Sequence, residues 1–271
     1  MSIDAEILSL IENLKNEETA IRKRSTYALA RLGSKAQEAV PALLEALEDQ
    51  DAGVRRMAAE ALGHIPSLEE HVVAALTKCL QDQNADVRIG ATLGLSQIET
   101  ATSPTITALM SALQDENISV RNNAAAALRN LGLVAREAVP YLVKALQDEY
   151  HGVRLNAAAA LGEMGAEAKQ ATDALVQVLQ DSEATVRQCA AFALGRIGVT
   201  DQKSLLALIL SLEDEDRSVR FRAAEALGEF GSVAQSAIPA LTKALGDQER
   251  IVCHFAANAI NKINNRSNTE N

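Results

Sequence analysis

The sequence has 271 residues, of which 48% are hydrophobic and only 3% aromatic, and its formal net charge is −10. Abundant Ala and Leu with few aromatic residues and no Trp favour a large core of packed helices over a β-sandwich. No apolar run approaches the roughly 18 residues of a membrane helix, and the acidic balance disfavours nucleic acid, whose binding depends on clustered Lys and Arg.

The N-terminal segment 1–15 lacks the basic-then-apolar order of a signal peptide. The cysteines Cys79, Cys189 and Cys253 are odd in number and have no C-x-x-C spacing, which argues against a disulfide framework and a zinc site. The four histidines form no H-E-x-x-H pair. We therefore expect a cytoplasmic protein that contacts no membrane and holds no metal or other cofactor.

A repeat of thirty-three residues organises the chain. The dipeptide Val-Arg recurs at this interval, with Ile-Arg before the first occurrence and Val-Cys after the last. Eight repeats without an insertion predict a single domain over 1–264, followed by a polar tail over 265–271. The predicted repeats are 1–33, 34–66, 67–99, 100–132, 133–165, 166–198, 199–231 and 232–264.

Each repeat predicts two helices. In the second repeat, Leu43 and Leu47 lie one helical turn apart and mark one face of a first helix over about 40–48. A second helix follows, and its apolar stripe consists of Val54, Ala58, Ala61, Leu62 and Ile65.

Proline and glycine mark the ends of these helices. Prolines stand where first helices begin, a position at which the missing N–H costs little, and glycines stand where second helices end. The prolines are Pro41, Pro140 and Pro239, and the glycines are Gly33, Gly132, Gly165, Gly198 and Gly231. Because one helical hairpin cannot bury its own stripe, we expect an all-α fold in which eight hairpins stack into an α-α superhelix.

Residues 39–63 read A-V-P-x-L-x-x-A-L-x-D-x-x-x-x-V-R-x-x-A-A-x-A-L-G. This pattern resembles the HEAT-like repeat of the phycobilisome-lyase type, and the resemblance covers the whole chain. It implies a solenoid whose second helices line the concave surface. It leaves the function open, because bilin lyases, phycobilisome-degradation factors and adaptors without chemistry of their own share such repeats.

A regular pair of Asp and Arg, six residues apart, recurs in the inner repeats. The resemblance implies that these residues form a structural ladder of hydrogen bonds within and between layers, in which Arg offers a rigid fork to carboxylates and carbonyls. The first repeat has Asn16 and the last has Cys253 at these positions, so we expect missing rungs at the ends. The ladder pairs are Asp49 and Arg55, Asp82 and Arg88, Asp115 and Arg121, Asp148 and Arg154, Asp181 and Arg187, and Asp214 and Arg220.

The repeats differ most on the side of the second helix opposite its apolar stripe, at the repeat positions of Arg56 and Glu60. We call this side the second-helix face. An exposed apolar patch there would mark a partner surface, although close packing of adjacent second helices is the alternative explanation. The candidate partner-binding residues are Tyr27, Arg56, Ile89, Leu93, Asn122, Arg129, Leu155, Phe192, Phe221 and Arg222.

The second-helix face is also basic. The repeat positions of residues 52, 53, 56, 57, 60, 63 and 64 hold ten cations and five anions, a net charge of +5, which leaves −15 for the rest of the chain. A basic face on an acidic rod attracts an acidic partner. The leading hypothesis is therefore a non-enzymatic scaffold that binds an acidic or amphipathic segment of another protein.

Two other functions stay open. The resemblance suggests a phycobilin lyase, or another protein that handles the chromophore or binds a phycobiliprotein, with Tyr27, Arg31, Phe192 and Phe221 around the bilin. The sequence shows no catalytic constellation for that chemistry. Nucleic-acid binding, as in HEAT-like glycosylases, is disfavoured by the acidic total and by the absence of Trp.

Overall fold

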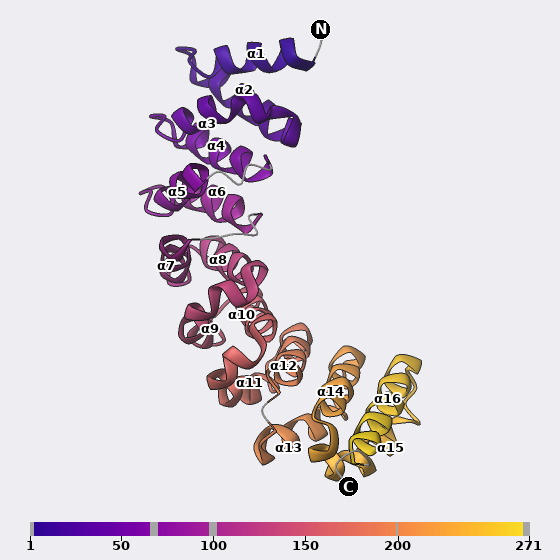
Figure 1. Cartoon of the computed structure of the whole chain (residues 1–271). Helices are drawn as coiled ribbons and strands as arrows, with labels where there is room; N and C mark the ends of the chain where they lie inside the picture. The colour runs from indigo at the N-terminus through magenta and orange to yellow at the C-terminus, as the bar shows by residue number, and fades with distance from the viewer. Residues whose placement is uncertain (1–2, 66–69, 98–101, 199, 268–271) are drawn as a thin grey trace. The chain divides into compact units, whose positions relative to one another are not determined.

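The computed structural model describes residues 3–65, 70–97, 102–198 and 200–267. Within these ranges the chain is all-helical and contains no β-strand (Figure 1), which confirms the predicted fold class. The backbone divides into two compact units, Met1–Val134 and Ala135–Asn271. The single domain over 1–264 stays a prediction. No helix in the described ranges has both the length and the apolar composition needed to cross a membrane.

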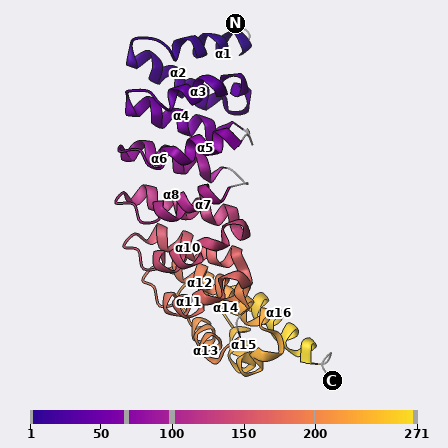
Figure 2. The same ribbon diagram turned by 60° about the vertical axis from the view of Figure 1, so that its left-hand side comes forward.

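The first unit is built from antiparallel helix pairs that stack in chain order (Figures 1 and 2). Each odd-numbered helix packs on the even-numbered helix that follows it, and the even-numbered helices pack on one another. The helices are α1 (Ile3–Asn13), α2 (Thr19–Leu32), α3 (Val40–Ala46), α4 (Ala52–His64), α5 (Glu70–Cys79), α6 (Ala85–Ser96), α7 (Ser103–Ala112) and α8 (Ile118–Leu131), with a 3₁₀ helix η1 (Gly33–Ala39) between α2 and α3.

The second unit repeats this arrangement, and its even-numbered helices again pack side by side. The 3₁₀ helix η2 (Gly132–Ala138) spans the boundary between the units. The helices are α9 (Val139–Ala145), α10 (His151–Met164), η3 (Gly165–Ala171), α11 (Thr172–Val178), α12 (Ala184–Ile197), α13 (Gln202–Ser211), α14 (Arg217–Glu229), η4 (Gly231–Ala237), α15 (Ile238–Ala244) and α16 (Arg250–Ser267).

The residues predicted to begin and end helices do so. The three prolines lie in the first turns of α3, α9 and α15. The five glycines that were predicted to end second helices all have positive φ, from 51° at Gly132 to 71° at Gly198. An L side chain is strained at such angles, so glycine lets the chain leave the helix here. The sequence did not predict that a 3₁₀ helix follows four of these glycines.

The core of each unit lies between the two helices of a pair. The leucines at the repeat position of Leu43 are 0% exposed from Leu43 to Leu241, whereas Leu10 in the first repeat is half-buried. The alanines of the second helices, such as Ala58 and Ala190, are also fully buried. Small residues on this stripe let neighbouring even-numbered helices approach closely, which is why a chain with few aromatic residues can still fill its core.

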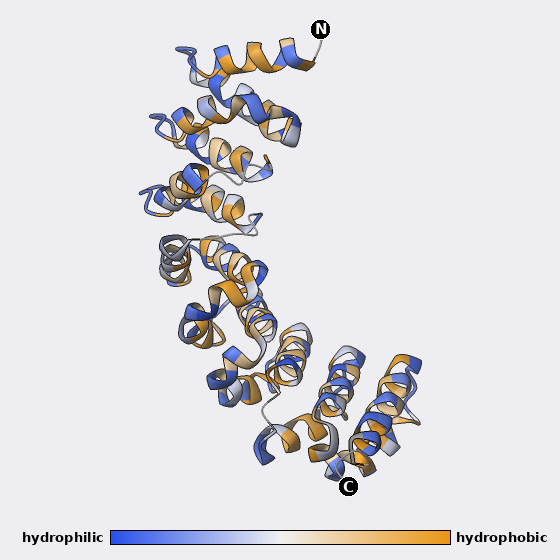
Figure 3. Cartoon of the chain, in the orientation of Figure 1, coloured by the Kyte–Doolittle hydropathy of each residue, from blue (hydrophilic) through white to orange (hydrophobic). Residues whose placement is uncertain are grey.

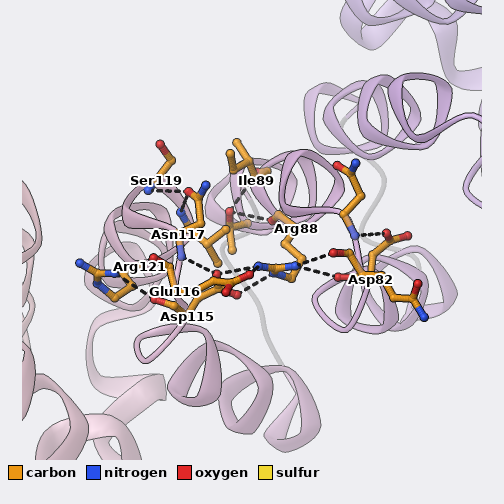
Figure 4. A network of polar contacts seen from close by, with 12 residues as sticks. Asp82, Arg88, Ile89, Asp115, Glu116, Asn117, Ser119 and Arg121 are labelled. Atoms are coloured by element: carbon orange, nitrogen blue, oxygen red, sulfur yellow. Dashed lines mark hydrogen bonds and ion pairs between the residues drawn. The ribbon is translucent and has the colours of Figure 1, made fainter.

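The turns between paired helices are hydrophilic (Figure 3). They hold the Asp residues predicted as a ladder, and the Arg residues lie near the start of the even-numbered helices that follow. Arg88 shows the geometry (Figure 4). Its Nε and Nη2 donate to the two carboxylate oxygens of Asp115 at 2.6 and 2.8 Å, and its Nη1 donates to the backbone carbonyl of Asp82 at 3.0 Å. The Asp115 carboxylate also accepts from the backbone N–H of Asn117 at 2.8 Å. One arginine therefore ties two consecutive turns together.

The structure shows which ladder contacts lie within a repeat and which lie between repeats. Arg55, for example, contacts Asp49, six residues earlier, through the backbone carbonyl of Asp49 and not through its carboxylate. The carboxylate that Arg55 binds is that of Asp82, 27 residues later. The same bidentate contact joins Arg22 to Asp49 and Arg88 to Asp115 in the first unit, and Arg154 to Asp181, Arg187 to Asp214 and Arg220 to Asp247 in the second. Arg121 binds the carbonyl of Asp115, and the carboxylate of Asp148 accepts from the N–H of Tyr150.

The prediction that the ladder lacks a rung at its N-terminal end is wrong, because Arg22 forms one with Asp49. Arg22 needs only a backbone carbonyl from its own repeat, and the carbonyl of Asn16 provides it at 2.9 Å. The ladder does end at Cys253, whose Sγ lies 3.2 Å from the carbonyl of Asp247 in place of a guanidinium.

The ladder carboxylates have lowered pKa values. Burial raises the pKa of the Asp214 carboxyl, but hydrogen bonds from Arg187 and from the backbone N–H of Asp216 lower it more, so the net pKa lies below the ordinary value of 3.8. The same balance lowers the pKa of Asp49, Asp82, Asp115 and Asp181. Because these pKa values are lowered by folding, the stability that the carboxylates contribute is complete above the ordinary pKa and is lost as the pH falls through the folded pKa.

We therefore expect the free energy of unfolding to change little between about pH 7 and about pH 5 and to fall steeply below about pH 4. Urea denaturation at each pH measures this dependence. The variant Asp214→Asn lacks one of the titrating carboxylates, so its loss of stability below pH 4 should be smaller than that of the unsubstituted protein. An equal loss in both proteins would show that this carboxylate is not linked to folding.

Candidate functional site

The candidate partner-binding residues all lie on even-numbered helices. Tyr27 on α2 is 54% exposed. The other nine are half-buried: they lie neither in the fully buried core nor among the exposed large hydrophobic residues. Their side chains therefore pack against neighbouring helices on one side and keep part of their surface accessible on the other. Which of them bind a partner stays a prediction.

In the first unit these residues are dispersed among short-range polar contacts. Arg56 donates to Glu60 on the same helix at 2.9 Å, and Lys23 pairs with Asp51 at 2.9 Å. Between α4 and α6 the backbones approach closely through glycine, as shown by Gly90, whose added Cβ would lie 2.6 Å from a carbonyl oxygen of Arg56.

In the second unit the structure brings three of these side chains together with a further phenylalanine. We call Phe192, Phe221, Arg222 and Phe255 the aromatic–arginine cluster; they come from α12, α14 and α16. The guanidinium carbon of Arg222 lies 5.3 Å from the ring centre of Phe192 and 5.1 Å from that of Phe221. Phe221 in turn stacks on Phe255, with ring centres 5.3 Å apart and an interplanar angle of 27°. The cluster is thus a continuous stack across three helices.

The neighbouring residues fix the position of this stack. Gly162 on α10 makes room for Phe192, because a Cβ at Gly162 would lie 2.9 Å from the ring. Arg222 Nη1 donates to Glu225 at 2.6 Å, whereas its buried Nε has no hydrogen-bond partner in the described part of the chain. Contacts with two rings and a bond to Glu225 hold the guanidinium in one orientation.

Two adjacent pockets flank the cluster. One has a volume of about 350 Å³ and is lined by Phe192, Arg196, Arg222 and Glu229 among others. The other, of about 240 Å³, is lined by Phe255, Asn258 and Lys262 among others. Glu225 lines both pockets, so they form two neighbouring depressions along successive even-numbered helices.

Charges of alternating sign run along these pockets at a single repeat position. The position holds Glu163, Arg196, Glu229 and Lys262 on α10, α12, α14 and α16. Lys262 and Glu229 form an ion pair at 2.6 Å between the last two of these helices. The pockets therefore combine aromatic walls with both signs of charge, a lining that suits an amphipathic segment better than a purely apolar one.

The sequence analysis identified Phe192, Phe221 and Arg222 but missed Phe255, Glu225 and the role of Gly162. A signal for Phe255 was present, because it lies one full repeat after Arg222 and therefore occupies the same repeat position on the next second helix. The alternation of charge from Glu163 to Lys262 is also visible in the sequence, at intervals of one repeat.

The described residues offer no site for a metal. No group of three or more His, Cys, Asp or Glu side chains within these ranges is arranged to hold an ion. Burial raises the pKa of the Cys79 thiol to about 11, which keeps it protonated.

The family follows from the repeats. The family model described as HEAT repeats matches residues 7–96, 106–175, 140–212 and 172–261, and thus most of the chain. The chain belongs to the HEAT-repeat family. The match is to HEAT repeats in general and does not single out the phycobilisome-lyase type.

Solved structures share this HEAT-repeat fold. The chain is similar to an engineered protein of known crystal structure, with a TM-score of 0.70 and 24% identity over 95% of this chain and 78% of that chain. It is also similar to the Escherichia coli protein YibA, with a TM-score of 0.65 and 24% identity over 97% of this chain and 93% of that chain. No curated protein matched the sequence. These likenesses support the fold alone.

Proposed function

We propose that this HEAT-repeat chain is a non-enzymatic scaffold that acts in the cytoplasm and binds an acidic or amphipathic segment of another protein along the second-helix face. The aromatic–arginine cluster is the observation that supports this proposal. The chain has only four Phe residues: two of them contact Arg222 at this surface, a third stacks on one of these two, and the fourth, Phe230, is buried in the core.

Aromatic residues and Arg supply most of the binding energy at protein interfaces because they bury a large area with few rotatable bonds. Arg222 is already fixed by its stack, so little side-chain entropy is lost when a partner contacts it. The two pockets beside Glu225 can accept two side chains of a partner that crosses successive helices. The net positive charge of the second-helix face favours acidic residues in that partner.

The bilin-lyase hypothesis depended on the lyase-type resemblance, which the family match does not reproduce. We therefore propose no bilin chemistry for this chain.

Selection of binders from a displayed library of random peptides tests the proposal. We expect the enriched peptides to be acidic or amphipathic, and we expect Arg222→Gln and Phe192→Ala each to raise their Kd at least about 10-fold, the effect of an interface hot spot. Fluorescence anisotropy with purified peptides gives the Kd, and circular dichroism verifies that the variants stay folded.

Lys78→Gln is the matched control, because Lys78 on α5 of the first unit forms an exposed ion pair with Glu48, which lies just after α3. It should leave the Kd unchanged. If no peptide is enriched, or if Lys78→Gln weakens binding as much as Arg222→Gln does, the second-helix face is not the binding surface.

A further inference from the structure

Helix α13 carries an exposed apolar pair, and one of its two positions is polar in every other repeat. Leu206 and Leu210 lie one turn apart and are 50% and 68% exposed. At the repeat position of Leu210 every other repeat has a polar or charged residue: Glu12, Glu45, Lys78, Ser111, Lys144, Gln177 and Lys243. Leucine is therefore not required at this position by the packing of the solenoid.

Charged residues flank this pair symmetrically. Lys203 precedes Leu206 by three residues and Glu213 follows Leu210 by three residues, and both side chains are exposed. Lys203, Leu206 and Leu210 follow one another at spacings of three and four residues on one face of α13, and Glu213 lies in the turn directly after this helix, which ends at Ser211. The pattern is symmetric about Leu208. A two-fold axis through that point would set Leu206 against Leu210 of a second molecule, and Lys203 against Glu213.

The neighbouring helices extend the same symmetry. Asp173 on α11 pairs with Lys203, and Lys243 on α15 pairs with Glu213, so the three helices lie side by side at this surface. Asp173 lies one repeat before Leu206, and Lys243 lies one repeat after Leu210. The same two-fold axis therefore sets Asp173 against Lys243 of the second molecule. Each of the four charges would meet an opposite charge.

We propose that this surface, the α13 stripe of Asp173, Lys203, Leu206, Leu210, Glu213 and Lys243, joins two copies of the chain in an isologous dimer. In such an interface the same surface of both molecules is used, so that if Leu206 of one molecule contacts Leu210 of the other, Leu210 of the first contacts Leu206 of the second. Helices of 10, 7 and 7 residues have a summed length of about 36 Å, so with a spacing of about 10 Å the three helices present about 360 Å² per molecule. This area is below that of a standard stable interface, so the dimer is weak and forms at high concentration.

The α13 stripe is independent of the proposed peptide-binding surface. It lies on odd-numbered helices, whereas the aromatic–arginine cluster lies on even-numbered helices. A dimer would present two such clusters, which raises the avidity for a partner with two binding segments.

Sedimentation equilibrium between about 10 μM and about 1 mM tests the dimer. We expect the weight-average mass to rise toward that of two chains, and Leu210→Glu to stay monomeric over the whole range. Leu8→Glu is the matched control, because Leu8 occupies the repeat position of Leu206 on α1 and is 57% exposed, yet its helix has Glu12 at the position of Leu210. It should dimerise like the unsubstituted chain.

An exchange of charges tests the two-fold register. Lys203→Glu should weaken dimerisation at least about 10-fold, because Glu would then face Glu213 of the second molecule. The double variant K203E/E213K should restore it. Within one molecule the exchange still removes the pairs with Asp173 and Lys243, so only pairing between molecules can produce the recovery. A chain that stays monomeric at 1 mM, a control that dissociates, or an exchange without recovery would each overturn the proposal.

Discussion

Replacement of Arg187 by Ala should lower the free energy of unfolding by about 3–5 kcal/mol, the cost of removing one partner from a buried ion pair. The Arg187 side chain is only 8% exposed and that of Asp214 only 12%. The guanidinium donates to both Asp214 oxygens at 2.8 Å and to the carbonyls of Asp181 and Ser182 at 2.9 and 3.2 Å. Alanine would leave a carboxylate and two carbonyls without these donors in a half-buried turn.

Urea denaturation of Arg187→Ala and Arg187→Lys measures this cost. Lysine keeps the charge but cannot reproduce the planar fork, so Arg187→Lys should recover only part of the loss. Lys243→Ala is the matched control: it removes the ion pair with Glu213 on the same unit, but both side chains are more than half exposed, and the expected cost is at most about 1 kcal/mol. Equal losses in Arg187→Ala and Lys243→Ala would mean that the ladder does not stabilise the fold.

The ladder shows how far a repeat can be interpreted from sequence. The constant length of the repeat is sufficient to place an Asp in the turn and an Arg at the start of the second helix of each inner repeat. It does not distinguish the Asp of the same repeat from the Asp of the next one, because both recur with the same period. The packing of consecutive turns decides between them. The Arg187 guanidinium reaches the carboxylate of Asp214, 27 residues later, whereas it contacts Asp181, six residues earlier, through the backbone carbonyl.

The helices themselves were predictable for local reasons. Proline and glycine act through backbone geometry within one or two residues, so Pro41 and Gly33 fix helix ends whatever the rest of the chain does. The leucines at the position of Leu43 were predictable because four-residue spacing defines a helix face.

The candidate site was only partly predictable, because burial depends on the neighbouring helix. Phe192 was identified from a variable repeat position, but its place between Gly162 and Arg222 depends on residues 30 positions away on both sides. The α13 stripe was not predicted, because a binding surface was expected only at the variable positions of the second helices. Leu210 differs there from all seven of its equivalents, which is a signal that the repeat alignment contains.

The closest approach between helices leads to the second large effect. Gly63 on α4 lies against Gly94 on α6, and a Cβ at Gly63 would lie 2.3 Å from the Cα of Gly94 and 2.9 Å from its carbonyl oxygen. These are backbone atoms, which cannot rotate away as a side chain could. Gly63→Ala must therefore push α4 and α6 apart, and we expect it to lower the free energy of unfolding by at least about 3 kcal/mol, at the upper end of the cost of overpacking.

Gly246→Ala is the control for the change from Gly to Ala. Its Cβ would meet only the carbonyl of Lys243, at the ordinary contact distance of 3.5 Å, and Gly246 does not have positive φ. We expect its effect in urea denaturation to stay within about 0.5 kcal/mol, as for a surface substitution. If Gly63→Ala were as stable as Gly246→Ala, α4 and α6 could separate without cost. The even-numbered helices of the first unit would then not need glycine to pack, and the second-helix face of that unit would have room for phenylalanine side chains, which only the second unit has.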